Sequence, residues 1–173
     1  MHPRETAWLI EQVSKAETFA EIGCWHGITT RNIASRTRAT YYAVDHFEGS
    51  PELESQWGGP EEQFRILLSN VHGLSNVKIV PMKSVEAAKS LSDVGFDVVF
   101  IDAAHDYDSI KSDVESWAPL IKKTGLLCGH DYGWFVKNGA RDGVTKYVNE
   151  SLPTREIVRG TTIWYVKRGE WTI

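Results

Sequence analysis

The sequence predicts an α/β fold with a doubly wound, Rossmann-like sheet that is mostly parallel and carries an antiparallel hairpin strand at its C-terminal edge. Short apolar runs alternate with segments of helical periodicity, which is the order of βαβ units. The run FDVVFID at 96–102 is apolar enough for a central strand buried on both faces of a parallel sheet. The tail REIVRGTTIWYVKR at 155–168 has two β-branched and aromatic runs around Gly160, as an edge hairpin would.

The other elements follow in a regular order, each bounded by Gly, Pro, Asn or Ser. A first helix at 4–16 places Ala7, Ile10, Val13 and Ala16 on one face. Further strands are expected at 17–23, 40–45, 76–81 and 125–131, and further helices at 28–37, 60–71, 84–91, 107–117 and 143–152. Sheets of this kind gather ligands beyond the carboxyl ends of their strands, so candidate site residues are sought there.

Length and charge narrow the functional classes. A single core usually serves roughly 100 to 200 residues, so the 173 residues are expected to form one domain, 1–173. The 42% of hydrophobic and 24% of charged residues are the mix of an ordinary soluble globular protein. The 19 Lys and Arg are scattered among 23 Asp and Glu, without a cationic face, which argues against nucleic acid as a partner.

Membrane and secretion signals are also not expected. The longest apolar run, around Val98 to Ile101, is far shorter than the roughly 20 residues that cross a bilayer. The N-terminal segment MHPRETAWLIEQV lacks the apolar core of a signal peptide, which indicates a cytoplasmic location. Cys24 and Cys128 could form one disulfide, but their apolar or glycine-rich surroundings favour buried, reduced thiols.

The first strand ends in EIGCWHGITT, where Gly23 and Gly27 flank a tight turn into a helix. Free N–H groups at that helix start suit a carboxylate or phosphate. The dinucleotide pattern G-x-G-x-x-G needs glycine where Trp25 stands, and no G-K-[ST] follows, so NAD and phosphate-loop binding are disfavoured. Glu21 is expected to accept hydrogen bonds from loop N–H groups or from a cationic ligand group. The alternative is a purely structural turn with a capping acid.

The second strand ends at Asp45, about two dozen residues after Glu21, a separation typical of an acid that binds ribose hydroxyls in this architecture. A nucleoside ligand is therefore plausible, although a solvated acid at the start of a loop is the simpler alternative. After the third strand, PMKSVEAA could place Met82 on a base ring and Ser84 near a base edge.

The motifs that carry a family resemblance span nearly the whole chain. They are the two motifs above, FDVVFIDAAHDYDSIKSDVESWAPLIKKTGLLCGHDY, and the closing GVTKYV and TTIWYVKR segments. The sequence resembles a class I S-adenosylmethionine-dependent methyltransferase. It is similar in detail to small sugar and natural-product O-methyltransferases grouped with macrocin and rhamnosyl methyltransferases and with cephalosporin hydroxylase-like proteins. The resemblance implies a seven-stranded sheet with the last strand inserted antiparallel, and S-adenosylmethionine as the cofactor. The cofactor-binding residues expected from the motifs are Glu21, Gly23, Cys24, Trp25, Gly27, Asp45, His46, Ser84 and Asp102.

The chain departs from the family in two ways. The common methyltransferase turn has a glycine where Trp25 stands, although this subgroup often carries a bulkier residue there. Members also tend to be longer, with an N-terminal extension or lid over the substrate, whereas only one helix is expected here before the first strand.

Two acids should converge at the ends of the fourth and fifth strands. Asp102 and Asp131 follow neighbouring central strands, and two carboxylates facing one cavity suit Mg²⁺. In the resembling enzymes, the positions that match Asp102, His130 and Asp131 hold the divalent metal. His130 stands where a second acid is common, which could shift the preference toward Mn²⁺. The alternative for His130 is a core histidine bonded to the backbone.

His105 is the candidate general base, with Asp102 beside it in the catalytic site. Methyl transfer needs an acceptor oxygen aligned with the sulfonium methyl and the removal of one proton. A histidine with an ordinary pKa of about 6.5 is mostly neutral at pH 7 and can accept that proton. His105 also matches the catalytic histidine of macrolide-sugar methyltransferases. Alternatively it caps the helix near Asp106 or lies in solvent, and the helix dipole alone explains Asp106 and Asp108.

Aromatic residues surround these strand ends, namely Phe47, Trp57, Tyr132, Trp134 and Phe135. They suit the faces of a sugar or polyphenol, or else they close a core edge or form a homodimer contact. The predicted function is metal-assisted, S-adenosylmethionine-dependent O-methylation of a small hydroxylated acceptor such as a sugar or natural product. The alternatives are a noncatalytic S-adenosylmethionine-binding module and another nucleotide-dependent α/β enzyme.

Overall fold

The computed structural model describes residues 1–49, 58–133 and 142–170. Its strands are β1 (Thr18–Ile22), β2 (Thr40–Val44), β3 (Val77–Val80), β4 (Phe96–Ile101), β5 (Ile121–Gly129), β6 (Glu156–Ile157) and β7 (Trp164–Lys167). Its helices are α1 (Pro3–Val13), α2 (Ile28–Ala34), α3 (Pro60–Val71), α4 (Ser84–Ser90), α5 (Tyr107–Trp117) and α6 (Gly143–Ser151), with a 3-10 turn at Ala118–Leu120 after α5.

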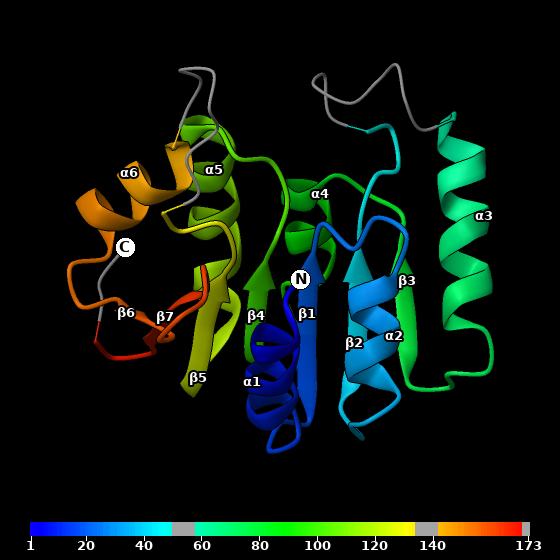
Figure 1. The fold of residues 1–173 in the computed structure, drawn as a ribbon, viewed down its shortest axis with the longest axis horizontal. Helices are drawn as coiled ribbons and strands as arrows, with labels where there is room; N and C mark the ends of the chain where they lie inside the picture. Colours follow the sequence, from blue (N-terminus) through cyan, green and yellow to red (C-terminus); the bar gives the residue numbers. More distant parts are fainter. Residues whose placement is uncertain (50–57, 134–141, 171–173) are drawn as a thin grey trace.

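One seven-stranded sheet runs through the molecule in the order β3-β2-β1-β4-β5-β7-β6 (Figure 1). β1 to β5 are parallel, whereas β7 pairs antiparallel with β5 and with β6. The predicted seven-stranded sheet with an inserted antiparallel strand is thereby confirmed. The predicted hairpin is also present, but its outer strand is only two residues long. The turn begins at Val158, whose N–H donates to Ile163 O and whose carbonyl accepts from Thr161 N.

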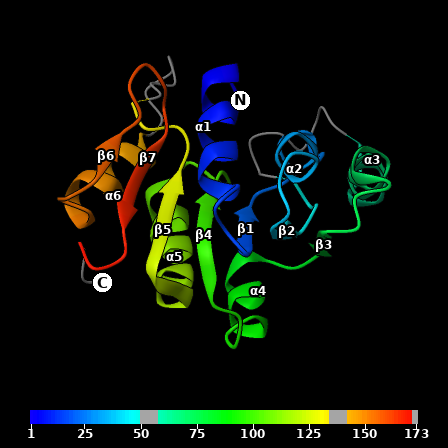
Figure 2. The ribbon, with the colours of Figure 1, turned by 90° about the horizontal axis from the view of Figure 1, so that it is seen from below.

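The helices form one layer on each face of the sheet. α1, α2 and α3 lie on one face and α4, α5 and α6 on the other (Figure 2). β4 contributes to both cores, with Val98 and Phe100 facing the first helical layer and Val99 and Ile101 the second. A strand covered on both sides has no solvent face, which explains its uninterrupted apolar sequence.

The amino end of the sheet is closed by structural polar contacts. Asp97 accepts hydrogen bonds from the backbone N–H groups of Glu17 and Thr18, at 2.9 and 3.0 Å, and from Lys122 Nζ at 3.0 Å. Lys122 belongs to the first part of β5, which begins at Ile121 rather than at the predicted 125. The polar residues Lys122, Lys123 and Thr124 hide this extension in the sequence, although Ile121 pairs with Phe96 of β4.

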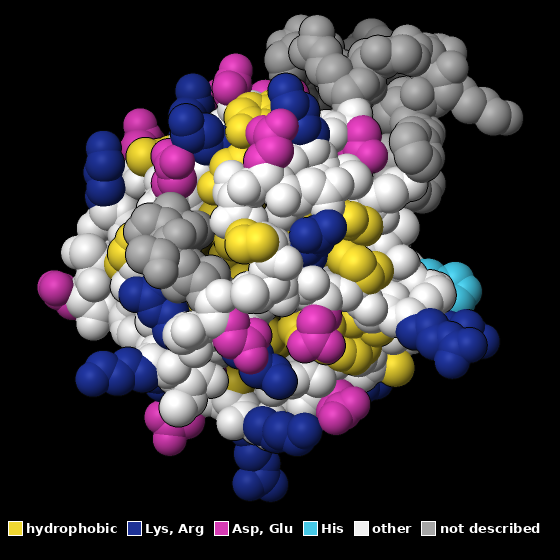
Figure 3. All heavy atoms as spheres, turned by 90° about the vertical axis from the view of Figure 1, so that its left-hand side faces the viewer, with side chains coloured by type: hydrophobic (Ala, Val, Ile, Leu, Met, Phe, Trp, Pro, Cys, Tyr) yellow, Lys and Arg dark blue, Asp and Glu magenta, His cyan; other side chains and the backbone are white. Residues whose placement is uncertain are grey.

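The outer edge of the sheet, with β6 and α6, carries mixed charge. Figure 3 shows positive and negative side chains interspersed on this face, with hydrophobic side chains between them. Ile157 of β6 is 37% exposed there. Within the described ranges, no helix is both long and apolar enough to span a membrane.

Candidate functional site

Unusual backbone conformations gather at the carboxyl ends of the strands. Among the described residues, those other than glycine with positive φ are Trp25 (43°), Phe47 (59°) and Asp131 (63°), and they lie in the loops after β1, β2 and β5. An aspartate tolerates this left-handed region, but a tryptophan or phenylalanine does so only when its surroundings hold it there. Such concentrated strain is typical of a functional edge.

The predicted convergence of Asp102, His130 and Asp131 is present at this edge. Asp102 N donates to Ile22 O at 2.8 Å and His130 N donates to Ile101 O at 3.0 Å, so both residues continue the strand ladder. His130 Nδ1 lies 3.0 Å from Asp131 Oδ1 and 3.6 Å from Asp102 Oδ1. One potential ligand atom from each of the three residues lies within 4.8 Å of the other two. We call these three residues the edge cluster.

His105 joins the edge cluster through Asp131. Its Nε2 lies 3.0 Å from Asp131 Oδ2, and half of its side chain is exposed. The α5 helix is capped by Asp106, whose carboxylate accepts a hydrogen bond from Ser109 N at 3.0 Å. The alternative of His105 as the helix cap is therefore wrong. Asp131 instead stands between two imidazoles, where it can orient both.

A residue that the sequence interpretation missed lies behind His130. Glu5 of α1 is 4% exposed, and its Oε2 is 3.1 Å from His130 Nε2, within ion-pair distance but not aligned as a hydrogen bond. His130 is thus not the backbone-bonded core histidine of the alternative interpretation. The sequence marks Glu5 only as an acid in the first turn after Pro3, which is common on solvated helices.

The edge cluster is electrostatically coupled. Burial acts to lower the pKa of His130, but Asp131, Asp102 and Glu5 outweigh it and raise that pKa to about 9. Burial acts to raise the pKa of Asp131, but hydrogen bonds from His105 and His130 hold it well below its usual range. Burial, reinforced by Asp131 and opposed by His130, raises the pKa of Asp102. Carboxylates crowded in this way favour positive charge among them.

Glu21 is buried at the end of β1. Its Oε2 accepts hydrogen bonds from Thr30 Oγ1 at 2.5 Å and from Tyr41 OH at 2.7 Å. The donors are therefore two side-chain hydroxyls rather than the expected loop N–H groups. Burial raises the pKa of Glu21 to about 8, with the nearby charges of Asp102 and Asp45 adding to the effect. Cofactor binding by Glu21 stays a prediction.

The backbone of the loop after β1 lies close to the backbone of the loop after β4. Gly23 has φ 90°, and a Cβ atom there would lie 2.2 Å from Asp102 O, so only glycine fits. Gly27 is the N-cap of α2 with φ 71°, and a Cβ atom there would lie 2.4 Å from Leu67 Cδ1. The thiol of Cys24 is buried in the core, so a ligand can meet Cys24 only through its backbone. These glycines bring the candidate cofactor loop beside Asp102.

Asp45 holds two strained residues in place. Its Oδ2 accepts from Trp25 N at 2.7 Å and its Oδ1 from Phe47 N at 2.8 Å, which ties the loop after β1 to the loop after β2. A carboxylate has about four lone-pair directions, so two remain for other donors. Asp45 is therefore more than the solvated acid of the alternative interpretation, and its contact with ribose stays a prediction.

The other predicted cofactor residues have local partners. The Trp25 indole stacks on His26 at 4.1 Å and donates to Gln63 Oε1 of α3. His46 is exposed, and its Nδ1 accepts from Glu48 N at 3.1 Å. Ser84 Oγ accepts from Trp117 Nε1 at 2.9 Å, within the packing of α4 against α5. Cofactor binding by Trp25, His46 and Ser84 stays a prediction.

Two of the predicted aromatic residues, Phe47 and Tyr132, lie in the described part of the chain. Phe47 is buried and packs edge-on against Phe64 with ring centroids 5.1 Å apart, so it closes a core edge. Tyr132 donates its hydroxyl to Asn149 Oδ1 of α6 at 2.9 Å. Trp57, Trp134 and Phe135 lie outside the described residues.

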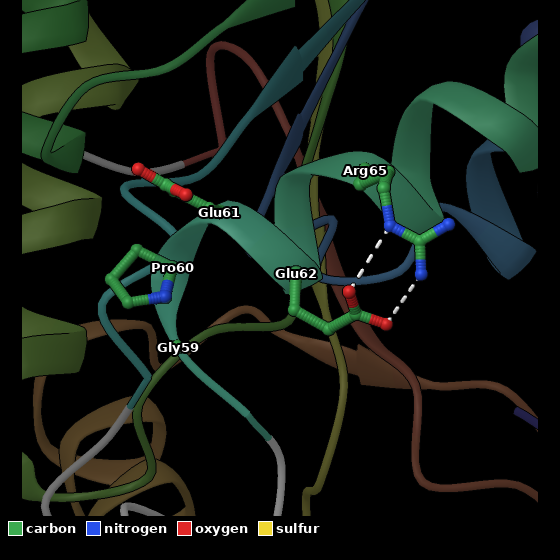
Figure 4. Close-up of a pocket in the computed structure, with 5 residues that line it drawn as sticks. All are labelled: Gly59, Pro60, Glu61, Glu62 and Arg65. Atoms are coloured by element: carbon green, nitrogen blue, oxygen red, sulfur yellow. Dashed lines mark hydrogen bonds and ion pairs between the residues drawn. The ribbon is translucent and has the colours of Figure 1, made fainter.

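A hollow at the start of α3 is separate from the edge cluster. It is lined by Gly59, Pro60, Glu61, Glu62 and Arg65. Figure 4 shows Glu62 and Arg65 facing each other, and two hydrogen bonds of 2.6 and 3.1 Å join them. The acid and the base satisfy one another here, so this hollow carries none of the predicted chemistry.

The chain was then compared with known proteins. Residues 20–132, more than half of the chain, match a family model described as a methyltransferase domain. That region contains the last three residues of β1, all of β2 to β5 and the whole edge cluster. The comparison with curated proteins gave no match.

Solved structures share the fold. A protein described as a caffeoyl-CoA O-methyltransferase from Staphylococcus aureus is 19% identical, with a TM-score of 0.70 over 96% of this chain and 83% of that chain. An O-methyltransferase from Bacillus cereus in complex with SAH is 16% identical, with a TM-score of 0.68 over 96% and 82%. A TDP-rhamnose 3′-O-methyltransferase, an enzyme in calicheamicin biosynthesis, is 14% identical, with a TM-score of 0.67 over 96% and 78%. At these identities, the likeness establishes the fold.

Proposed function

The chain belongs to the methyltransferase domain family, and on that premise we propose that it moves a methyl group from S-adenosylmethionine to a hydroxyl oxygen of a small acceptor such as a sugar or natural product. The observation that carries the proposal is the meeting of Asp102, His105, His130 and Asp131 beside the Gly23 loop. Similar folds include a TDP-rhamnose methyltransferase, which supports a hydroxylated acceptor. Transfer of a labelled methyl group to sugars or catechols tests it.

The cofactor is proposed to lie along the loops after β1 and β2. Its amino acid end would meet residues 21–27. Its ribose hydroxyls would donate to those lone pairs of the Asp45 carboxylate that do not accept from Trp25 N or Phe47 N. No side chain caps the start of α2 at Gly27, so the first N–H groups of that helix would be available to the carboxylate of the cofactor. In this proposal these loops bind S-adenosylmethionine and orient it.

The edge cluster fits a divalent cation. Two carboxylates and an imidazole nitrogen within 4.8 Å are donors that Mg²⁺ or Mn²⁺ accepts. When bound, the cation would supply positive charge that makes an acceptor hydroxyl more acidic. His105 would then take the hydroxyl proton, and Asp131 at 3.0 Å would orient the ring and stabilise the imidazolium that forms.

Asp45→Ala is expected to weaken S-adenosylmethionine binding by about 1.5 to 3 kcal/mol, because charge-assisted hydrogen bonds are lost. Asp45 also fixes the backbones of Trp25 and Phe47, so calorimetry should include Asp45→Asn, which keeps an acceptor for one backbone N–H. A weaker affinity in both variants, at unchanged unfolding temperature, identifies a ligand contact. Unchanged affinity in Asp45→Ala removes Asp45 from the cofactor site.

Asp131→Asn is expected to weaken Mn²⁺ and Mg²⁺ binding by at least about tenfold, because it removes a charged oxygen while keeping the size of the side chain. Asp108→Asn is the matched control, since Asp108 is an exposed acid in the first turn of α5. Isothermal titration of each protein with metal measures the effect. If Asp131→Asn and the wild type titrate identically, the metal assignment is wrong.

A further inference from the structure

Glu5 is a buried acid whose contacts all point inward. Its Oε2 accepts from His2 N at 2.6 Å and lies 3.1 Å from His130 Nε2. Its Oε1 accepts from Thr162 N at 3.1 Å and from Thr162 Oγ1 at 3.2 Å. The carboxylate therefore joins the first helix, the segment before β7 and the histidine after β5.

The surroundings of Glu5 call for a carboxylate rather than an amide. Two backbone N–H groups and a hydroxyl donate to its two oxygens, and the ring nitrogen Nε2 of His130 lies within ion-pair distance of one of them. A glutamine would turn its NH₂ group toward at least one of these donors, whichever way its amide lies. Helix capping alone needs only the contact to His2, so it does not explain the other three.

The ring of His130 separates two groups of acids. Nε2 faces Glu5, whereas Nδ1 faces Asp131 and Asp102 at 3.0 and 3.6 Å. A histidine that binds a metal through one nitrogen usually donates the other N–H to a carboxylate, which fixes the tautomer and the ring orientation. Glu5 lies on that side of His130, with its Oε2 atom 3.1 Å from Nε2, at ion-pair distance and not aligned as a hydrogen bond in this structure.

We propose that, when a divalent cation is bound, Glu5 is a positioning residue that keeps the proton of His130 on Nε2, so that the lone pair of Nδ1 faces the cation site between Asp102 and Asp131. The inference rests on the cation site proposed above. It gives the first helix a part in orienting His130, although no residue of α1 is among the proposed cation ligands. Glu5 acts on the site only through His130.

The structure separates this role from a structural one. Oε1 serves Thr162, whereas Oε2 serves His130, so Thr162→Val removes a hydroxyl donor from Glu5 without touching the ring contact. Glu5→Gln changes both sides. Both variants therefore weaken the contact between Glu5 and Thr162 before β7, but only Glu5→Gln also changes the contact with His130.

Calorimetric titration with Mn²⁺ alone, after removal of metals with EDTA, makes the first test. Glu5→Gln is expected to bind Mn²⁺ about 10- to 100-fold more weakly than the wild type, the usual cost of losing a carboxylate behind a metal-bound histidine. Thr162→Val should keep the wild-type Mn²⁺ affinity even where its unfolding temperature falls. An equal loss of affinity in Thr162→Val would overturn the positioning role.

A spectroscopic test starts from the wild type. Histidine-ring ¹⁵N spectra of the Mg²⁺-loaded protein, assigned with His130→Asn, should show the His130 proton on Nε2. Glu5→Gln should move population to the Nδ1–H form, which loss of packing alone would not do. A His130 proton on Nδ1 in the wild type, or equal Mn²⁺ affinities of wild type and Glu5→Gln, overturns the inference alone. If the wild type binds no Mn²⁺, the cation site falls together with it.

Discussion

His105→Ala is expected to lower turnover about 10²- to 10⁴-fold, the usual contribution of a general base. The reason is geometric, since the half-exposed ring of His105 lies beside the edge cluster and is oriented by Asp131 at 3.0 Å. Affinities for S-adenosylmethionine and Mn²⁺ should stay near wild type, because His105 belongs to neither proposed ligand set. Steady-state kinetics with labelled S-adenosylmethionine and calorimetry measure both sides of this prediction.

The pH profile gives the His105 prediction a second test. Protonation of the imidazole removes its ability to accept a proton, so the wild-type rate should fall on the acid side, and the variant should lose that limb. His72→Ala is the control, since His72 is an exposed histidine at the end of α3. Near-normal turnover of His105→Ala, with the same acid limb, would leave positioning and the cation as the whole of catalysis.

The cofactor-free protein is expected to lose stability as the pH rises from about 4.5 to about 8, because of Glu21. Burial raises the pKa of Glu21 from 4.5 to about 8, so the folded protein holds a proton in this window that the unfolded chain releases. The stabilising effect of that proton is complete below pH 4.5 and is lost as the pH passes through 8. The contribution falls by about 1.4 kcal/mol per pH unit within the window.

Glu21→Gln isolates this contribution. A glutamine carbonyl can accept the same hydrogen bonds from Thr30 and Tyr41, but it does not titrate. The difference in unfolding free energy between variant and wild type, measured in urea at several pH values, should therefore grow in favour of the variant with rising pH. Parallel curves for the two proteins would show that Glu21 is ionised throughout.

The sequence predicts the edge cluster because parallel strands impose it. Once β4 and β5 are recognised as neighbours, Asp102, His130 and Asp131 must leave the sheet at one edge, and His105 follows three residues after Asp102. The direct contact of His105 with Asp131 is not predictable, since it depends on the course of a loop. Strand spacing therefore predicts which residues meet, while the loops decide how they meet.

Contacts between distant elements are the part that the sequence cannot supply. Glu5 has the pattern of any acid in a first helical turn, and its burial depends on Thr162, which is 157 residues further along. The hydroxyl partners of Glu21 come from α2 and β2, where Thr30 and Tyr41 have ordinary helix and strand patterns. Local periodicity predicts which face of a helix or strand is buried, but it does not predict which side chains contact one another there.

The close approach of Gly23 to the backbone of Asp102 has a thermodynamic consequence. No side chain fits between Gly23 and the backbone of Asp102, so a shift of one backbone there is expected to reach the other. A ligand on the loop after β1 is therefore expected to affect the position of Asp102, and a ligand on Asp102 is expected to affect that loop. Such linkage is reciprocal, so the proposed S-adenosylmethionine and the proposed cation are expected to change one another's affinity by the same factor, whichever of them binds first.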